Sequence, residues 1–214
     1  MITKFTIYGE RCSGTNFLEK AIMENFDNIE ITWQYGWKHF FGFNDLSNSS
    51  NVLFIGIVRN PFDWLYSFHQ TPHHVPKQNI PIAKFLSNEF YSIHDNGDIC
   101  KEDMNYETNK PYTNIFELRK MKNKYLMEVM PSKVKNYILI KYEDLNNQYE
   151  KTLDNIEKLF NLRKKQQVYK KIIDYKGKSG QIYVKKLNKF AQPIFKTIYQ
   201  NLDKQQEKML GYVI

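Results

Sequence analysis

The stretch FTIYGERCSGTNFLEKAI, residues 5–22, predicts a strand, a tight loop and a helix in immediate succession. Strand-forming residues at 4–8 lead into Gly9, and the loop ends at Gly14. Apolar residues then recur at helical spacing between 15 and 26. Two glycines separated by four residues are typical of a phosphate-binding loop, where backbone N–H groups and a helix start hold an anion. The stretch therefore predicts an anion site at the end of the first strand.

The residues after Gly14 disfavour hydrolysis of ATP or GTP. The positions that would hold the phosphate-binding lysine and the Mg²⁺-binding hydroxyl are Thr15 and Asn16. No aspartate closes a clear strand either, because the apolar run at 137–140 ends in Lys141. The backbone donors and the helix dipole do not depend on those side chains. We therefore predict an anion site without a metal.

Cys12 raises the alternative of a cysteine phosphatase, since a helix N-terminus lowers the pKa of a thiol. Such an enzyme needs an arginine six residues later, and this chain has Leu18 there. We interpret Cys12 as a small residue of the anion-binding loop.

The remaining segments predict a single α/β domain, residues 1–214, with three layers (α/β/α) and a mostly parallel central sheet. Residues 51–58, NVLFIGIV, form an apolar run typical of a strand buried on both faces. Asn60 and Pro61 then predict a helix start. Further strands are expected at 29–33 and 137–140, and further helices at 82–90, 113–130 (ending at Pro131) and 149–160. Ligands of such sheets bind at the carboxyl ends of the strands, here after Tyr8, Val58 and Ile140.

Composition indicates a globular chain whose charge is unevenly distributed. Its net charge is +8, but residues 161–214 hold 13 Lys and Arg against 3 Asp and Glu, a net +10. This basic quarter favours an anionic ligand and leaves open nucleic-acid binding or a simple solvated surface. No membrane span and no signal peptide are apparent, and two cysteines make no disulfide framework, so we expect a cytoplasmic protein.

Two motifs resemble those of the sulfotransferases that use PAPS (3′-phosphoadenosine 5′-phosphosulfate). The strand, SGTN and helix resemble their 5′-phosphosulfate loop, which implies that this group is held by Arg11, Cys12, Ser13, Gly14, Thr15 and Asn16. VRNPFDWLYSF, residues 58–68, resembles their second signature, in which a serine follows a strand-end arginine by eight residues. The resemblance implies that Arg59 and Ser67 hold the 3′-phosphate.

Three further segments extend the resemblance over almost the whole chain. ILIKYEDL (138–145) and LDKQQEKMLGY (202–212) resemble a later strand and the last helix. YKGKSGQ (175–181) resembles a basic loop that closes over the 3′-phosphate, which implies a role for Lys176, Gly177 and Lys178. The chain departs from the family where the usual loop lysine is Cys12, so Arg11 or Lys38 is expected to hold the phosphosulfate instead.

The resemblance implies a P-loop-like sulfotransferase that transfers a sulfuryl group from PAPS to a hydroxyl or amine of an unidentified acceptor, with a carbohydrate or small molecule favoured. His39, in GWKHFFGF (36–43), is the expected general base, Lys38 is expected to stabilise charge, and Glu10 is the alternative base. The alternatives are an ATP-dependent P-loop kinase of a small substrate and a non-enzymatic nucleic-acid binder.

The histidines 69, 73 and 74 form a His-x3-His pattern, but Pro72 interrupts the helix that a zinc site of this kind needs. We predict no metal site there and expect these histidines to border the acceptor cleft. The acceptor loops are expected at 34–50 and 70–112, and the sequence fixes neither the acceptor nor the oligomeric state.

Overall fold

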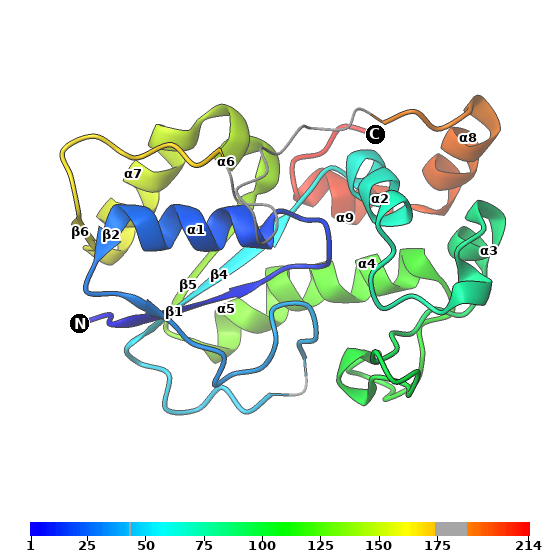
Figure 1. Ribbon diagram of the computed structural model, residues 1–214, viewed down its shortest axis with the longest axis horizontal. Coiled ribbons are helices and arrows are strands. Elements are labelled where there is room, and N and C mark those ends of the chain that lie inside the picture. Colours follow the sequence, from blue (N-terminus) through cyan, green and yellow to red (C-terminus); the bar gives the residue numbers. More distant parts are fainter. Residues whose placement is uncertain (43, 174–187) are drawn as a thin grey trace.

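The computed structural model describes residues 1–42, 44–173 and 188–214, and these contain one parallel sheet of four strands (Figure 1). Its order is β3 (Glu30–Ile31), β1 (Lys4–Tyr8), β4 (Val52–Val58), β5 (Asn136–Lys141), and every pairing is parallel. The parallel α/β sheet predicted from the sequence is confirmed. The second predicted strand, 29–33, is wrong in length, since only two of its residues pair with β1.

Helices cover both faces of the sheet, which is compatible with the expected three layers (Figure 1). One face carries α1 (Thr15–Asn25), α6 (Tyr142–Asn147) and α7 (Tyr149–Phe160). The other carries α4 (Ile115–Lys124), a π-helical turn (Tyr125–Val129) and α5 (Met130–Lys133).

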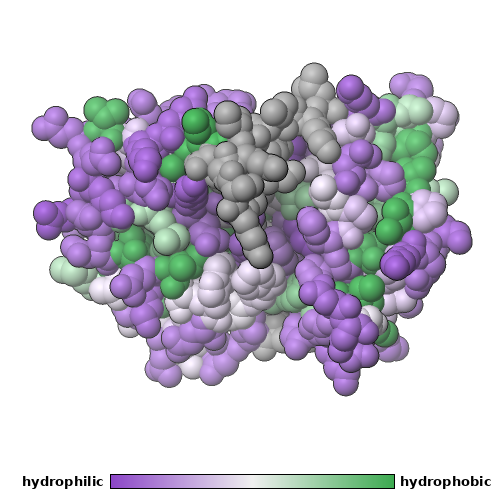
Figure 2. All heavy atoms as spheres, viewed as in Figure 1, coloured by the Kyte–Doolittle hydropathy of each residue, from purple (hydrophilic) through white to green (hydrophobic). Residues whose placement is uncertain are grey.

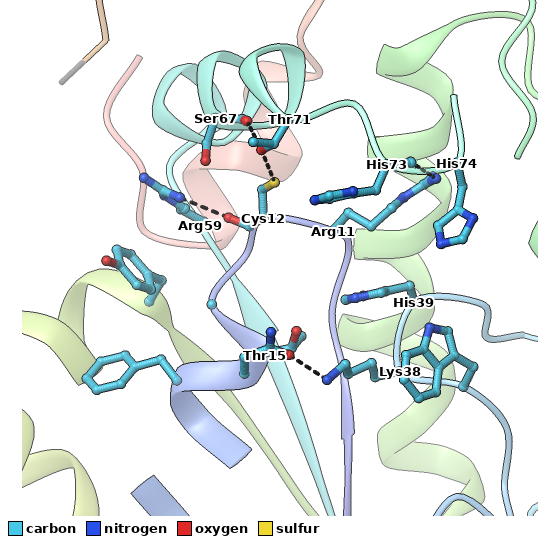
Figure 3. Close-up of a pocket in the computed structure, with 15 residues that line it drawn as sticks. Arg11, Cys12, Thr15, Lys38, His39, Arg59, Ser67, Thr71, His73 and His74 are labelled. Carbon is cyan, nitrogen blue, oxygen red and sulfur yellow. Dashed lines mark hydrogen bonds between the residues drawn. The ribbon is translucent and has the colours of Figure 1, made fainter. Parts of the chain in front are cut away.

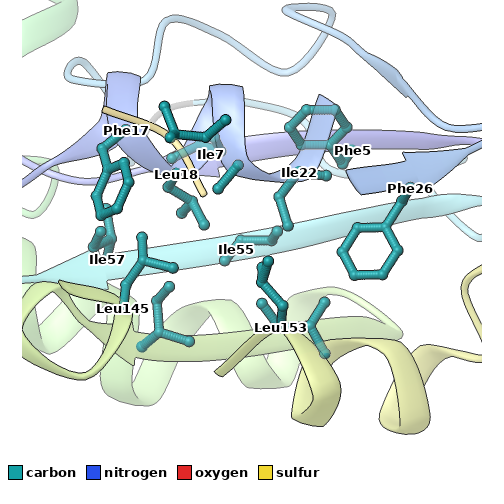
Figure 4. Close-up of a cluster of buried hydrophobic side chains, with 14 of the residues drawn as sticks. Phe5, Ile7, Phe17, Leu18, Ile22, Phe26, Ile55, Ile57, Leu145 and Leu153 are labelled. Carbon is teal, nitrogen blue, oxygen red and sulfur yellow. The ribbon is translucent and has the colours of Figure 1, made fainter. Parts of the chain in front are cut away.

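The central strand β4 is buried on both sides, as its apolar run predicts. Leu53, Ile55 and Ile57 pack with α1 and α7 (Figure 4). Val52, Phe54 and Val58 alternate with them and pack against the π-helical turn on the opposite face. This alternation follows from the two-residue period of a strand.

A second group of elements lies beyond the carboxyl ends of the strands. It contains α2 (Pro61–Gln70), α3 (Ile82–Ser87), α8 (Gln192–Asn201) and α9 (Lys204–Met209), with 3₁₀ turns at Lys77–Asn79 and Lys101–Asp103. A short antiparallel ribbon pairs β2 (Phe26–Asp27) with β6 (Arg163–Lys164). The Asn60 side chain caps α2 by accepting from two backbone N–H groups, which confirms the predicted helix start.

The helix predicted to end at Pro131 instead continues to Lys133. The preceding π-helical turn pairs each carbonyl with the N–H five residues later, so the partner of the Leu126 carbonyl would be Pro131, which has no N–H. The Tyr137 hydroxyl donates to that carbonyl at 2.6 Å in its place. The proline is thus tolerated because a side chain of β5 replaces the missing donor.

On the face drawn in Figure 2, hydrophilic residues predominate and hydrophobic ones occur in small separate groups. Among the described residues, no helix combines the length and the apolar character that crossing a membrane requires.

Candidate active site

A pocket of about 390 Å³ opens where β1 and β4 end (Figure 3). The chain leaves β1 toward β3 on one side and returns to β4 on the other, so the pocket lies at the point where the strand order reverses. Open α/β sheets bind ligands at such points. The lining residues are Arg11, Cys12, Gly14, Thr15, Asn16, Phe17, Trp37, Lys38, His39, Arg59, Ser67, Thr71, His73, His74 and Tyr142.

The loop between β1 and α1 has the tight geometry that its glycines predict. Cys12 has a φ of +65° and Gly14 a φ of +96°. A Cβ atom on Gly14 would lie 2.4 Å from the Tyr142 ring, so only glycine fits there. Gly14 is the N-cap of α1 and supplies no side chain to the helix start, which leaves the positive end of the dipole facing the pocket.

Arg59 is buried in the pocket with its hydrogen bonding incomplete. Its side chain is 2% exposed, and Nη1 donates to the Cys12 carbonyl at 2.9 Å. Its guanidinium lies 4.7 Å from the Tyr142 ring centroid. Nε and Nη2 have no hydrogen-bond partner in the described part of the chain. Buried donors without partners are costly, so these two nitrogens point to an anionic ligand.

Ser67 lines the same pocket from α2, as the resemblance to the second sulfotransferase signature implies. A second arginine fixes the backbone at the end of β4. Arg119 donates to the Arg59 carbonyl at 3.0 Å and also pairs with Glu207. Both residues expected at the 3′-phosphate therefore reach one cavity.

Arg11 differs from its expected role. Each nitrogen of its guanidinium already has a partner: Nε donates to Glu10, Nη1 to the His73 carbonyl and Nη2 to Asp103, at 2.7, 2.9 and 3.1 Å. Lys122, also buried, contacts both Glu10 and Asp103. We call Glu10, Arg11, Asp103 and Lys122 the buried charge cluster. Its two acids and two bases balance, so Arg11 lines the pocket as a structural cation whose nitrogens are all engaged, and it does not fit the role of phosphosulfate ligand.

Glu10 does not fit the role of the alternative base. It is buried and does not line the pocket. Burial by itself would raise the pKa of its carboxyl, but the charges of Lys122 and Arg11 outweigh burial and lower the pKa to about 2. Ser13 is likewise buried below the pocket, where its N–H donates to the Glu10 carbonyl at 3.0 Å.

His39 faces the pocket from the loop after β3 (Figure 3). Its Nδ1 lies 2.8 Å from the Gly9 carbonyl oxygen. A carbonyl only accepts, so Nδ1 carries the proton and Nε2 keeps its lone pair. Burial lowers the pKa of His39 to about 3, despite the opposing effects of Glu10 and the Gly9 carbonyl. The imidazole is therefore neutral at pH 7, and the lowered pKa makes it a weaker base than an ordinary histidine.

Lys38 brings a cation to the start of α1 from outside the loop. Nζ donates to Asn16 Oδ1 at 2.6 Å and to Glu19 at 3.0 Å. It lies 5.4 and 5.1 Å from the ring centroids of Trp33 and Trp37. Of the two bases expected to replace the loop lysine, Lys38 is the one that the geometry favours.

Of the other residues predicted to form the site, only some line the pocket. His73 and His74 line the pocket, whereas His69 is directed to the Ile80 carbonyl at 3.0 Å and does not. Lys176, Gly177 and Lys178 lie outside the described residues. Four residues at the site were not predicted from the sequence: Thr71, whose hydroxyl lies 3.5 Å from Cys12 Sγ, and the structural residues Asp103, Lys122 and Tyr142.

Comparison with protein families and with curated proteins gives no match for this chain.

Proposed function

We propose that the protein is a sulfotransferase that moves a sulfuryl group from PAPS to a hydroxyl or amine of an acceptor. The observation that carries the proposal is the pair of unpartnered guanidinium nitrogens of Arg59, buried in the same pocket as the uncapped start of α1. PAPS has a phosphate and a phosphosulfate at separate ends of its ribose, so it requires two anion sites in one cavity. Arg59 and the loop before α1 meet that requirement.

In this proposal, Arg59 and Ser67 bind the 3′-phosphate. A guanidinium binds phosphate through two parallel hydrogen bonds, and Arg59 has two nitrogens available for them. The phosphosulfate is held at the start of α1 by the backbone of Gly14 and Thr15 and by Lys38.

PAPS, when bound, supplies the sulfuryl group, and the residues of the chain position the acceptor and move its proton. His39 Nε2 accepts the acceptor's proton as the oxygen or nitrogen attacks. The Gly9 carbonyl keeps the imidazole in the tautomer that can do so. Lys38 and the α1 dipole stabilise the negative charge that develops on the leaving oxygen. Holding PAPS and the acceptor together in one pocket lowers the entropic part of the activation barrier.

An ATP-dependent kinase is the rival function. The loop geometry would suit a kinase, but the chain lacks two side chains that a kinase of this type needs. Thr15 and Asn16 stand in place of the lysine and the Mg²⁺-binding hydroxyl. A nucleic-acid binder would explain the basic last quarter of the chain but not the unpartnered nitrogens of Arg59 inside a pocket.

Thermal unfolding with added ligands separates the three functions. We expect PAP, the desulfated product of PAPS, to raise the melting temperature without Mg²⁺. Stabilisation by ATP only with Mg²⁺ would indicate the kinase, and stabilisation by oligonucleotides that vanishes with salt would indicate the nucleic-acid binder. Transfer of labelled sulfate from PAPS to a panel of glycans, phenols and peptides then identifies the acceptor. No transfer to any acceptor and no stabilisation by PAP would refute the proposal.

A further inference from the structure

A hairpin outside the pocket brings together three side chains that suit a metal ion. Residues 93 and 99 form an antiparallel bridge, the His94 N–H donates to the Asp98 carbonyl at 2.8 Å, and the Cys100 N–H donates to the Ser92 carbonyl at 2.8 Å. The turn is closed at Gly97, which has a φ of +92°. This backbone places His94 and Cys100 on the two arms of one hairpin, next to Glu102.

The three ligand atoms have spacings close to those of a tetrahedral site. Cys100 Sγ lies 3.3 Å from Glu102 Oε2, and His94 Nε2 lies 3.7 Å from the same oxygen. All three atoms lie within 4.8 Å of one another. Zinc bonds of about 2.0–2.3 Å at tetrahedral angles place ligand atoms about 3.4–3.6 Å apart. Two of the three spacings are thus close to the required values, and the third, between His94 Nε2 and Cys100 Sγ, is no more than 4.8 Å and needs a closing movement of at most about 1 Å.

We propose that His94 Nε2, Cys100 Sγ and Glu102 Oε2 bind a zinc ion, with water as the fourth ligand. A thiolate and an imidazole select zinc and exclude Mg²⁺ and Ca²⁺, which prefer oxygen ligands. Binding breaks the S–H bond of Cys100, forms the S–Zn bond and releases the proton to solvent. The ion bridges the two arms of the hairpin.

The site is separate from the proposed active site but is connected to its floor. None of its three ligands lines the pocket. The hairpin leads directly into Asp103, whose carboxylate is bound by Arg11, Lys122 and the Ser92 hydroxyl. An ion that fixes the hairpin therefore also fixes the segment carrying Asp103. The sequence spacing of His94, Cys100 and Glu102 matches no common zinc motif, so these ligands become visible only when the hairpin brings them together.

The test is titration of the metal-free full chain with ZnCl₂ by calorimetry. We expect one zinc ion per chain, no heat with MgCl₂, and an affinity at least about tenfold lower in Glu102→Gln and in His94→Gln. Both side chains are exposed, at 68% and 49%, so these variants are expected to fold. His69→Gln is the matched control, since His69 belongs to neither the pocket nor the hairpin, and its affinity should equal that of the wild type.

A second readout reports the sulfur ligand directly. Cobalt bound in place of zinc should give a thiolate-to-cobalt charge-transfer band that is absent from Cys100→Ser. Absence of saturable zinc binding, wild-type affinity in Glu102→Gln and His94→Gln, or a cobalt band that persists in Cys100→Ser would each overturn the proposal. Because PAP stabilisation is measured without zinc, failure here leaves the proposed function intact.

Discussion

Arg59 Nη1 donates a hydrogen bond to the carbonyl of Cys12 at 2.9 Å, which joins the end of β4 to the loop after β1. The two features of the pocket that we propose bind anions are therefore joined to each other. The residue that replaces the expected loop lysine contributes through its backbone, in a left-handed conformation with a φ of +65°.

Replacing Arg59 by alanine should weaken PAP binding by about 1.5–3 kcal/mol, because a charged hydrogen-bond donor to phosphate is lost. Arg59→Lys should restore only part of the affinity, since lysine keeps the charge but not the two parallel donors. Calorimetry with PAP measures both. Arg163→Ala, an exposed arginine on β6, is the matched control and should bind PAP as the wild type does. Unchanged affinity in a folded Arg59→Ala variant would contradict the assignment.

His39→Ala should leave PAP affinity nearly unchanged and lower sulfuryl transfer by about 10²–10⁴-fold, the usual contribution of a general base. Since burial lowers the pKa of His39 to about 3, the acidic limb of kcat/KM should lie near that pH and not near 6.5. Only the neutral imidazole accepts a proton, so activity should be flat from mildly acidic to neutral pH. A limb that remains in His39→Ala would assign the titration to another group.

Stability should fall as the pH is lowered. The folded-state pKa of His39 is about 3 against an ordinary 6.5, and that of Glu10 about 2 against 4.5. The unfolded chain therefore binds more protons in acid, and the free energy of unfolding decreases with falling pH. The loss from His39 begins below about 6.5, with a slope of at most about 1.4 kcal/mol per pH unit because a single imidazole binds a single proton. Urea unfolding at pH 7 and pH 5 should show this slope in the wild type and a smaller one in His39→Ala.

Lys122→Met should lower the free energy of unfolding by about 3–5 kcal/mol, because it leaves buried carboxylates without one of their cations. Lys120→Met is the matched control: Lys120 is on the same helix, is half-exposed and pairs with Asp203 at the surface, so its loss should cost about 1 kcal/mol or less. Urea denaturation at pH 7 compares them. Equal losses in the two variants would show that the buried charge cluster is not a stabilising unit.

Gly14→Ala should destabilise the protein more than Gly97→Ala. Both glycines have a positive φ, so each substitution carries a backbone strain of about 1–2 kcal/mol. At Gly14 the new Cβ would also lie 2.4 Å from the Tyr142 ring, whereas at Gly97 no atom lies within 4 Å. Thermal unfolding measures the difference, and equal shifts would mean that the Tyr142 ring moves aside freely.

Segments whose conformation depends on residues close together in the chain could be predicted from the sequence. The strand, loop and helix at 4–26, the buried strand β4 and the Asn60 cap depend on residues close together in the chain, and α7 begins and ends where its period predicts. The resemblance of residues 58–68 to a sulfotransferase motif also implied that Arg59 and Ser67 share one site, and both line the pocket.

The errors concern contacts between distant segments. The partners of Arg11 include Asp103, 92 residues away, and Glu10 pairs with Lys122, 112 residues away, so no short pattern reveals that both side chains are already engaged. The Pro131 prediction failed for the same reason, since the substitute donor Tyr137 belongs to the next strand. Local rules predict the backbone of the site, and long-range contacts decide which side chains remain available to a ligand.

The buried charge cluster has a consequence for how this protein can diverge over time. Each of its four members contacts two of the others, and Arg11 and Lys122 also donate to backbone carbonyls. Loss of the charge at any one position therefore leaves a buried charge uncompensated. A single substitution in the cluster should therefore cost more stability than a pair of substitutions that removes one acid and one base together. Among sequences descended from this one, the four positions should therefore co-vary: the four residues should be retained together or replaced together.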